Sequence, residues 1–334
     1  MTIKTVKSLM MQAIIMEKPG GPEFLQIAAY PKPTPGPHEI LVRVRATALN
    51  RADILQRQGK YPPPPGESDI LGLEMAGEVA AVGAAVEKWQ PGARVCGLLA
   101  GGGYAEYIVL HKDMALPIPE NLDFVAAAAI PEAFLTAFQA LYWLGKLQPE
   151  ETVLIHAGAS GVGTAAIQLA KMAGAQVIVT ASGGKHPLCY ALGADRAIDY
   201  QQEDFAEQIL RHTDGVDLIL DFIGAPYLQK NLAVLRLDGR LICLAMMGGN
   251  MSRELFVGSI LRKRLQILGS TLRNRSLDYK IQLTRDFQLA AWAAFAKGQL
   301  HPVVDAVFDW QEVAEAHRYM EANRNQGKIV LQIP

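Results

Sequence analysis

The sequence predicts an α/β protein in which a β-rich domain is combined with a doubly wound parallel sheet. Two observations indicate this fold class. Turn residues and short strand-like runs alternate over the first third of the chain, and helical segments alternate with short apolar strands after about Ala126. With 334 residues, half of them apolar, the chain is long enough for two folded domains at roughly 100–200 residues each.

The β-rich first third is divided by turns that are rich in proline and glycine. Between these turns lie strand-like runs, which we place at residues 12–16, 40–45, 75–82, 93–98 and 105–109. The first of them begins only at Gln12, so we expect the first ten residues to form a loose extension.

Six apolar segments in the second half are expected to be strands of one sheet: residues 153–157, 176–180, 196–199, 217–221, 239–244 and 265–269. Helix-compatible segments separate them, and this alternation favours a doubly wound parallel sheet. The tail returns to strand-like runs around one helix. We therefore assign residues 1–130 and 303–334 to the β-rich domain and residues 131–302 to the sheet.

Charge and cysteine content argue against several classes of protein. The 32 basic and 33 acidic side chains leave a net charge of −1, which disfavours an extensive nucleic-acid or lipid-binding surface. Cys96, Cys189 and Cys243 lie far apart and form no Cys-x-x-Cys pair. No apolar run is long enough to span a membrane. We expect a protein of the cytoplasm, where thiols stay reduced.

A glycine-containing turn follows the first strand of the predicted sheet. It reads Gly158-Ala-Ser-Gly-Val-Gly163 and opens a helix, which is the order of elements that a dinucleotide-binding turn requires. Small residues let the backbone approach the pyrophosphate, and helix N–H groups point at it. Ser160 stands where the middle glycine of Gly-x-Gly-x-x-Gly belongs, and the alternative is a tight turn without a ligand.

The segment after the second strand favours NADPH over NADH. No acidic residue occurs between Gly158 and Asp195, although an acid about 20 residues past the first glycine holds the ribose in NAD sites. Ser182 and Lys185 offer a hydroxyl and an ammonium to a 2′-phosphate instead. Alternatively, both residues cap the next helix.

Five motifs carry a resemblance to a known family: residues 50–53 (NRAD), 61–66 (YPPPPG), 71–77 (LGLEMAG), 130–138 (IPEAFLTAF) and 156–163 (HAGASGVG). Over essentially its whole length the chain resembles the medium-chain dehydrogenase/reductase superfamily, and within it the zinc-independent NADPH:quinone oxidoreductases of the p53-inducible branch. The resemblance implies a GroES-like catalytic domain, a Rossmann nucleotide-binding domain and a homodimer.

The zinc ligands of this superfamily's alcohol dehydrogenases have no counterpart in the sequence. Asn50 falls where the first ligand, a cysteine, would be, and Leu73 replaces the histidine. No cysteine lies near residues 131–136, leucine has no lone pair to donate, and asparagine is a poor zinc ligand. We expect a metal-free site, with Glu74 in a hydrogen bond or an internal ion pair.

Without a metal ion, hydride transfer needs a substrate that is already electrophilic. A quinone ring or the β-carbon of an unsaturated ketone delocalises the developing negative charge. We therefore expect a small-molecule quinone or enone substrate. The alternatives are an enoyl or alkenal double-bond reductase, and an NADPH-binding sensor or scaffold with little turnover.

The resemblance implies that Asn50 and Tyr61 line the site near the nicotinamide, where Asn50 would offer an amide donor and Tyr61 a ring and a hydroxyl. The alternatives are a capping role for Asn50 and a packing role for the Tyr61 ring. Asp53 is expected to be structural and paired to an arginine. The cofactor residues implied are Asn50, Thr136, Gly158, Ser160, Gly161, Val162, Gly163, Ser182, Lys185, Tyr200, Ile223, Gly224, Met247, Gly248, Ser270, Leu272 and Asn325.

Overall fold

The computed structural model describes residues 9–252 and 255–334, and the chain divides into two compact units. Unit 1 is formed by the chain up to Leu135 and again by Arg273–Pro334, and unit 2 by Thr136–Leu272. The first strand, β1, begins at Met10, and the expected extension lies outside the described residues at positions 1–8.

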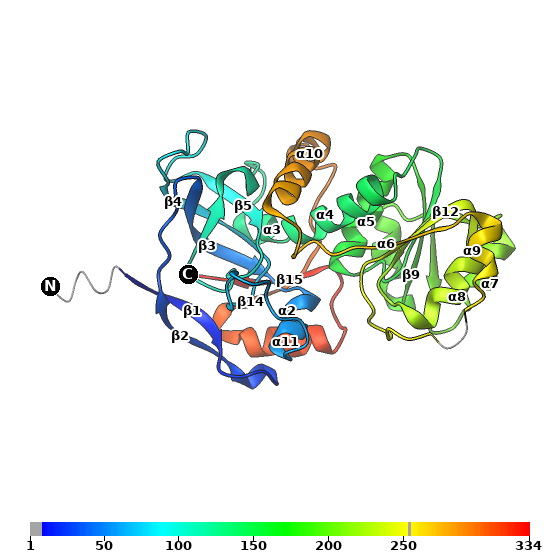
Figure 1. Cartoon of the computed structure of the whole chain (residues 1–334), viewed down its shortest axis with the longest axis horizontal. Coiled ribbons are helices and arrows are strands. Elements are labelled where there is room, and N and C mark those ends of the chain that lie inside the picture. Colours follow the sequence, from blue (N-terminus) through cyan, green and yellow to red (C-terminus); the bar gives the residue numbers. More distant parts are fainter. Residues whose placement is uncertain (1–8, 253–254) are drawn as a thin grey trace. The chain divides into compact units, whose positions relative to one another are not determined.

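Unit 1 contains a seven-stranded sheet and a separate two-stranded sheet formed by β1 and β2 (Figure 1). The large sheet has the order β14-β15-β3-β4-β5-β7, with β6 also paired to β3. Only the β14–β15 pair is parallel among these pairings of described residues. The strands are β1 Met10–Met16, β2 Leu25–Pro31, β3 Glu39–Ala48, β4 Glu74–Val82, β5 Arg94–Leu98, β6 Tyr107–His111, β7 Ala115–Pro117, β14 Val304–Asp309 and β15 Lys328–Gln332.

The helices of unit 1 are α2 Arg51–Arg57, α3 Phe124–Ala128, α10 Leu277–Ala296 and α11 Val313–Glu321, with the short turns η1 Pro22–Phe24, η2 Lys112–Met114 and η5 Trp310–Glu312. Helix α4 (Pro131–Phe138) begins in unit 1 and ends in unit 2.

Strand β3 shows why this part of the sequence folds as a sheet. Its alternate residues Ile40, Val42, Val44, Ala46 and Ala48 are completely buried, which is the period of two that a strand requires. The strand ends at Ala48, and this places the next polar residues at the entrance of α2.

Helix α10 lies in unit 1, although the expected boundary at residue 302 assigned it to the nucleotide-binding domain. The side chain of Trp292 donates its indole N–H to the carbonyl oxygen of Pro117 at 2.9 Å. Phe295 packs edge-on against Phe134, with ring centroids 4.9 Å apart. These contacts are made with residues far away in the sequence, so the local helical pattern does not reveal them.

Unit 2 is the expected doubly wound parallel sheet, and this prediction of the fold class is confirmed. The strand order is β10-β9-β8-β11-β12-β13, so the order reverses between β8 and β11, which is where ligands of such sheets bind. The strands are β8 Thr152–Ile155, β9 Gln176–Ala181, β10 Arg196–Asp199, β11 Val216–Asp221, β12 Leu235–Cys243 and β13 Gln266–Gly269.

Helices follow the strands of unit 2 in the chain, as the colours of Figure 1 show. They are α5 Gly161–Met172, η4 Gly183–Lys185, α6 His186–Ala191, α7 Phe205–His212, α8 Ala225–Val234 and α9 Gly258–Lys263, and the short helix η3 Gln139–Leu144 precedes the first strand. The core joins strands and helices, since Leu154, Ile219 and Leu241 pack with Phe205 and Leu232. Among the described helices of both units, none is sufficiently long and apolar to cross a bilayer.

Candidate functional site

The turn between β8 and α5 has no room for larger side chains at its glycines. A Cβ atom on Gly158 would lie 2.6 Å from the Cβ of Val179, and one on Gly163 would lie 2.4 Å from the carbonyl oxygen of Ala157. Both distances are shorter than real Cβ contacts. The backbone therefore turns tightly against β9, as a pyrophosphate-binding turn requires.

Helix α5 presents unpaired N–H groups at this turn. Ser160 is its N-cap, and the Ser160 hydroxyl accepts a hydrogen bond from the N–H of Gly163 at 3.1 Å. The preceding N–H groups, those of Gly161 and Val162, have no acceptor in the described part of the chain. A helix end of this kind attracts anions, so the turn fits the pyrophosphate of a nicotinamide dinucleotide.

The other residues expected to bind the cofactor in unit 2 follow the carboxyl ends of the parallel strands, which lie at one edge of the sheet. Tyr200, after β10, is 47% exposed, and Met247, after β12, is 52% exposed, so the Tyr200 ring and the Met247 thioether are open to a ligand. Ser270 is buried and donates its hydroxyl to Gln139 Oε1 at 3.0 Å. Grouped by strand, they are Ser182 and Lys185 after β9, Tyr200 after β10, Ile223 and Gly224 after β11, Met247 and Gly248 after β12, and Ser270 and Leu272 after β13.

A buried polar chain, which the sequence reasoning missed, shapes the turn after β11. Asp221 Oδ1 accepts the N–H groups of Ile223 at 2.7 Å and Gly224 at 3.1 Å. Asp221 Oδ2 accepts from Asn231 Nδ2 at 3.2 Å, so the Asn231 oxygen faces His156 Nε2 at 2.8 Å. Burial lowers the pKa of His156 to about 4, which keeps the ring neutral. These hydrogen bonds fix the backbone at Ile223 and Gly224, which are two of the residues expected to bind the cofactor.

A carboxylate also lies near the segment expected to bind the 2′-phosphate. Asp199 ends β10, which pairs in parallel with β9, and a Cβ atom on Gly183 would lie 2.8 Å from Asp199 Oδ2. The sequence that follows β9 does not reveal this acid, because it belongs to the neighbouring strand. Asp199 and Lys185 therefore carry opposite charges into the same end of the sheet.

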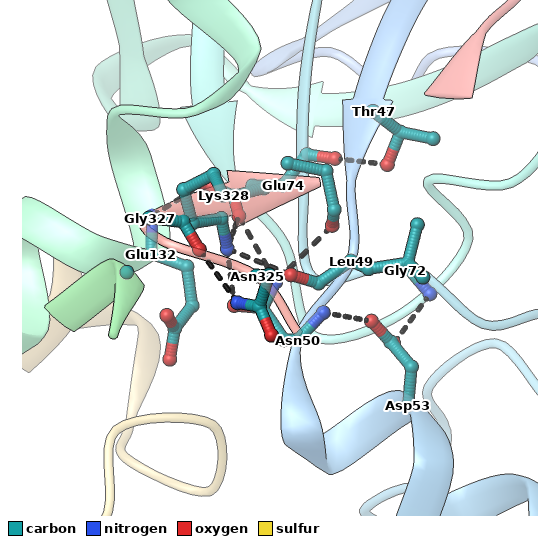
Figure 2. A network of polar contacts seen from close by, with 12 residues as sticks. Thr47, Leu49, Asn50, Asp53, Gly72, Glu74, Glu132, Asn325, Gly327 and Lys328 are labelled. Carbon is teal, nitrogen blue, oxygen red and sulfur yellow. Dashed lines mark hydrogen bonds and ion pairs between the residues drawn. The ribbon is translucent and has the colours of Figure 1, made fainter. Parts of the chain in front are cut away.

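In unit 1, Asn50, Glu74 and Lys328 form a buried hydrogen-bonded cluster (Figure 2). Lys328 Nζ lies 2.6 Å from Glu74 Oε1 and 2.6 Å from Asn50 Oδ1, and it donates to the carbonyl oxygen of Leu49 at 2.9 Å. Glu74 Oε2 accepts the N–H of Glu132 at 2.9 Å. The end of β3, strands β4 and β15, and the starts of α2 and α4 thus meet at one ion pair, the kind of pair expected for Glu74.

This cluster uses every proton of the Asn50 amide. Lysine can only donate, so the atom that faces Lys328 is the amide oxygen. The amide nitrogen then donates to Glu74 Oε1 at 2.9 Å and to the carbonyl oxygen of Ala48 at 3.2 Å. In this arrangement Asn50, the N-cap residue of α2, has no amide proton left for a substrate oxygen, which is the role expected of it.

The cluster includes Asn50, which the family resemblance places at the position of a zinc ligand, and Leu73, expected at the position of another, lies beside Glu74 in the sequence. Leu73 is buried and carries no lone pair, and the ammonium of Lys328 already binds the oxygens of Asn50 and Glu74. A divalent cation on those oxygens would be repelled by the ammonium. Within residues 9–252 and 255–334, no three His, Cys, Asp or Glu side chains gather in a way that could hold a metal ion.

Asp53 supports the same region through backbone hydrogen bonds. Its carboxylate accepts the N–H of Asn50 at 2.8 Å and the N–H of Gly72 at 3.0 Å, rather than forming the expected arginine pair within the described residues. Burial raises the pKa of Asp53 to about 6, while the two backbone N–H groups act in the opposite direction. Asp53 is therefore structural, as expected, but it ties the start of α2 to the segment before β4.

Tyr61 lies in the irregular segment after α2, and its ring is half-buried against Arg273. The guanidinium carbon of Arg273 is 5.4 Å from the ring centroid. Burial raises the pKa of the Tyr61 hydroxyl, and the cation of Arg273 opposes this shift. Of the remaining expected residues, Thr136 lies within α4 and Asn325 precedes β15, where Asn325 Nδ2 donates to the carbonyl oxygen of Gly327 at 2.8 Å.

Two known protein families match separate parts of this chain. A family described as "Alcohol dehydrogenase GroES-like domain" matches residues 36–120, and one described as "Zinc-binding dehydrogenase" matches residues 192–331. The first match lies in unit 1, and the second covers the later strands of unit 2 and the returning tail of unit 1.

Two curated relatives align with nearly the whole chain. The human synaptic vesicle membrane protein VAT-1 homolog is 30% identical over 347 residues, covering 96% of this chain and 86% of the relative. A mycocerosic acid synthase-like polyketide synthase of Mycobacterium tuberculosis is 32% identical over 324 residues, covering 95% of this chain. The chain spans only 15% of the length of that synthase.

Solved structures of three differently named enzymes share the fold over 97% of this chain. An NAD-dependent alcohol dehydrogenase is 34% identical with a TM-score of 0.86, and all of its chain is covered. The CurK enoyl reductase is 29% identical with a TM-score of 0.85 and 99% coverage. A quinone oxidoreductase from Pseudomonas syringae pv. Tomato DC3000 is 29% identical with a TM-score of 0.85 and complete coverage.

Proposed function

Because this chain belongs to the medium-chain dehydrogenase/reductase superfamily, in its zinc-independent part, we propose that it reduces quinones by metal-free hydride transfer from NADPH. The superfamily makes it an oxidoreductase with a nicotinamide cofactor. Beyond this, we propose that the cofactor is NADPH and that the substrate is a conjugated carbonyl compound.

The observation that carries this proposal is the buried cluster of Asn50, Glu74 and Lys328. The Lys328 ammonium holds the oxygens of Asn50 and Glu74, with both contacts at 2.6 Å, and Asn50 is the residue expected at the position of a zinc ligand. A reductase built in this way has no Lewis acid to polarise a simple ketone. It therefore suits substrates whose conjugation spreads the negative charge that hydride addition creates.

The residues of each unit would have separate tasks in this reaction. NADPH, when bound, supplies the hydride. The turn from Gly158 to Gly163 would hold its pyrophosphate, and Ser182 and Lys185 would bind its 2′-phosphate. In unit 1 the cluster fixes the start of α2, and Tyr61, which follows that helix, would contact the substrate through its ring and hydroxyl.

Reduction of a conjugated carbon–carbon double bond is a second candidate, favoured by specific similarities. The CurK enoyl reductase shares the fold, and the M. tuberculosis relative is a polyketide synthase. The same hydride donor and metal-free site would serve an enone or an enal. A sensor or scaffold that binds NADPH without turnover is the remaining alternative.

A substrate panel, followed by NADPH oxidation, tests the proposal. Phenanthrenequinone and para-benzoquinone represent quinones, benzylideneacetone an enone and crotonaldehyde an enal, while the saturated ketone benzylacetone is the matched control. We expect turnover of quinones and none of benzylacetone. For benzylideneacetone, NADPH deuterated at C4 should place deuterium on the β-carbon of the ketone product.

The results separate the candidates. Turnover of the enone and enal with none of the quinones would replace the first proposal by the second. NADPH binding without oxidation by any conjugated carbonyl would favour the sensor, and reduction of benzylacetone to an alcohol would contradict both reductases. The cytoplasmic location and the homodimer stay predictions, to be checked by localisation and by light scattering.

A further inference from the structure

Arg273 is a buried arginine with one nitrogen that has no partner. Its side chain is 6% exposed, and among the described residues its Nη1 atom is buried without a hydrogen bond. Nε donates to the carbonyl oxygen of Ala100 at 2.6 Å, and Nη2 donates to Gln56 Oε1 at 2.8 Å. An unsatisfied donor on a buried charge is costly, so native proteins rarely keep one without a ligand or water.

The guanidinium is held rigidly by its two satisfied nitrogens. Gln56 Nε2 donates to the carbonyl oxygen of Asp69 at 2.9 Å, which fixes the amide so that its oxygen faces Arg273. The glycines at 101–103 let the neighbouring loop come close, since a Cβ atom on Gly101 would lie 2.7 Å from the Ser68 carbonyl oxygen. Arg273 therefore presents Nη1 in one fixed direction, which lowers the entropy lost on binding.

A second buried cation lies beside Arg273. Lys280 is 8% exposed and lies in the first turn of α10. Among the described residues, its ammonium makes only a long contact, 3.4 Å, to the Arg273 carbonyl oxygen. Within the described residues, neither Arg273 nor Lys280 has a carboxylate within ion-pair distance. Asp53 and Glu67 both act on Arg273 through their charges, and Glu67 also acts on Lys280. The Asp53 carboxylate accepts the N–H groups of Asn50 and Gly72, and the Glu67 side chain is exposed. Among the described residues, these two desolvated positive charges thus have no carboxylate in direct contact.

Arg57 shows what a completed pair looks like in the same unit. It is also buried, and two of its nitrogens have no hydrogen-bond partner among the described residues, yet it forms an ion pair with Glu321. Arg273 differs because no carboxylate of the described residues lies within ion-pair distance of it, and Asp53 acts on it only from farther away. Tyr61, on the irregular segment 58–73, lies over the guanidinium and is only half-buried, so a turn of its ring would uncover the cation.

We propose that Arg273 and Lys280 form a subsite for a carboxylate group of the substrate, beside Tyr61. This inference rests on the proposed function, which identifies the ligand as the substrate. Arg273 directly follows Leu272, which is expected to bind the cofactor. Guanidinium groups bind carboxylates in a matching geometry. The substrate class is then a conjugated ketone or quinone that carries an acidic group.

Two non-reducible ketones of nearly equal size test the subsite without any turnover. Levulinate carries a carboxylate where acetonylacetone carries a methyl ketone. Their binding to the whole protein, with and without NADP⁺, is measured by calorimetry or ligand-observed NMR. A charge-assisted pair predicts that levulinate binds at least about tenfold more tightly. Equal binding, within about twofold, would overturn the proposal.

Variants test whether the tighter binding of levulinate comes from Arg273 and Lys280. Arg273→Gln should remove most of the levulinate preference, and Lys280→Met should reduce it, while Arg264→Gln changes a 62%-exposed arginine and should leave it intact. If Arg273→Gln does not fold, Arg273→Lys keeps the charge but loses the fork and should weaken levulinate alone. An unchanged preference in Arg273→Lys and Lys280→Met would contradict the assignment. Absence of quinone turnover would reject the proposed function, but not this binding result.

Discussion

The buried ammonium of Lys328 is held by one ion pair and two hydrogen bonds. All three of its ammonium protons have acceptors: Glu74, Asn50 and the Leu49 carbonyl oxygen. Both charged side chains are almost completely buried, with 5% and 0% of their surfaces exposed. Breaking such a pair leaves an uncompensated charge inside the protein, which costs more than the pair itself contributes.

We therefore expect Lys328→Met to lower the free energy of unfolding by about 3–5 kcal/mol. The double variant Lys328→Met/Glu74→Gln should recover part of this loss, because the stranded carboxylate becomes neutral. The partly exposed pair Arg45–Glu78 is the control, where Arg45→Met should cost at most about 1 kcal/mol. Urea unfolding measures all four proteins. If Lys328→Met and Arg45→Met lowered the free energy of unfolding equally, the expected cost of breaking the buried pair would be contradicted.

Substitutions at Lys185 and Asp199 should shift the preference between NADPH and NADH in opposite directions. Lys185→Glu should shift the ratio of NADPH to NADH affinity towards NADH by about tenfold or more, because a carboxylate repels the 2′-phosphate. Asp199→Asn should shift it towards NADPH, because the acid near Gly183 is removed. Fluorescence titration with each cofactor gives the ratio, and Asp238→Asn, at an exposed site, is the control. If neither ratio moves, these residues do not contact the ribose phosphate.

His156 and His317 make stability depend on pH. Burial lowers the pKa of His156 to about 4 and that of His317 to about 3, against about 6.5 in the unfolded chain. The unfolded chain therefore binds protons that the folded chain does not, and the free energy of unfolding falls as pH drops from about 6.5 towards 4. Asp53, with its pKa raised to about 6, contributes in the opposite direction between pH 6 and about 3.8.

Asp221, whose pKa burial also raises, acts in the same direction as Asp53. We expect the two histidines to dominate, so denaturant unfolding should show a net loss of stability in this window. Each uncompensated proton contributes about 1.4 kcal/mol per pH unit at most. His156→Gln should flatten the profile, whereas His212→Gln, at an exposed position, should not. A profile that is flat in the unmodified protein would refute the neutral, buried state of these rings.

In the proposed function, cofactor binding depends on the turn between β8 and α5. Its shape is fixed by the close approach of Gly163 to the Ala157 carbonyl oxygen and by the Ser160 cap. We expect Gly163→Ala to destabilise the protein by about 1–3 kcal/mol through overpacking, and to weaken NADPH binding as the helix end moves. Gly184→Ala, where nothing lies within 4 Å, should leave stability unchanged. Thermal unfolding and cofactor titration compare the two variants.

At the scale of the whole molecule, local patterns predicted the fold well and the site only in part. The alternation of apolar strands and helices indicated the parallel sheet, and the order of strand, glycine turn and helix located the Gly158 turn, because these signals are local. The pairing of Lys328 with Glu74 joins positions 254 residues apart (328 − 74), and no local pattern encodes it. Arg273 and Asp199 were missed for the same reason: their partners come from other elements.

The metal dependence of hydride transfer by the whole protein tests most directly whether the reduction proceeds without a metal ion. NADPH oxidation by phenanthrenequinone should be measured after exhaustive treatment with a strong chelator and again after zinc is added back. Metal-free reduction predicts the same rate in the untreated, depleted and zinc-supplemented protein, with no metal retained by elemental analysis. A rate that disappears with depletion and returns with zinc would contradict it.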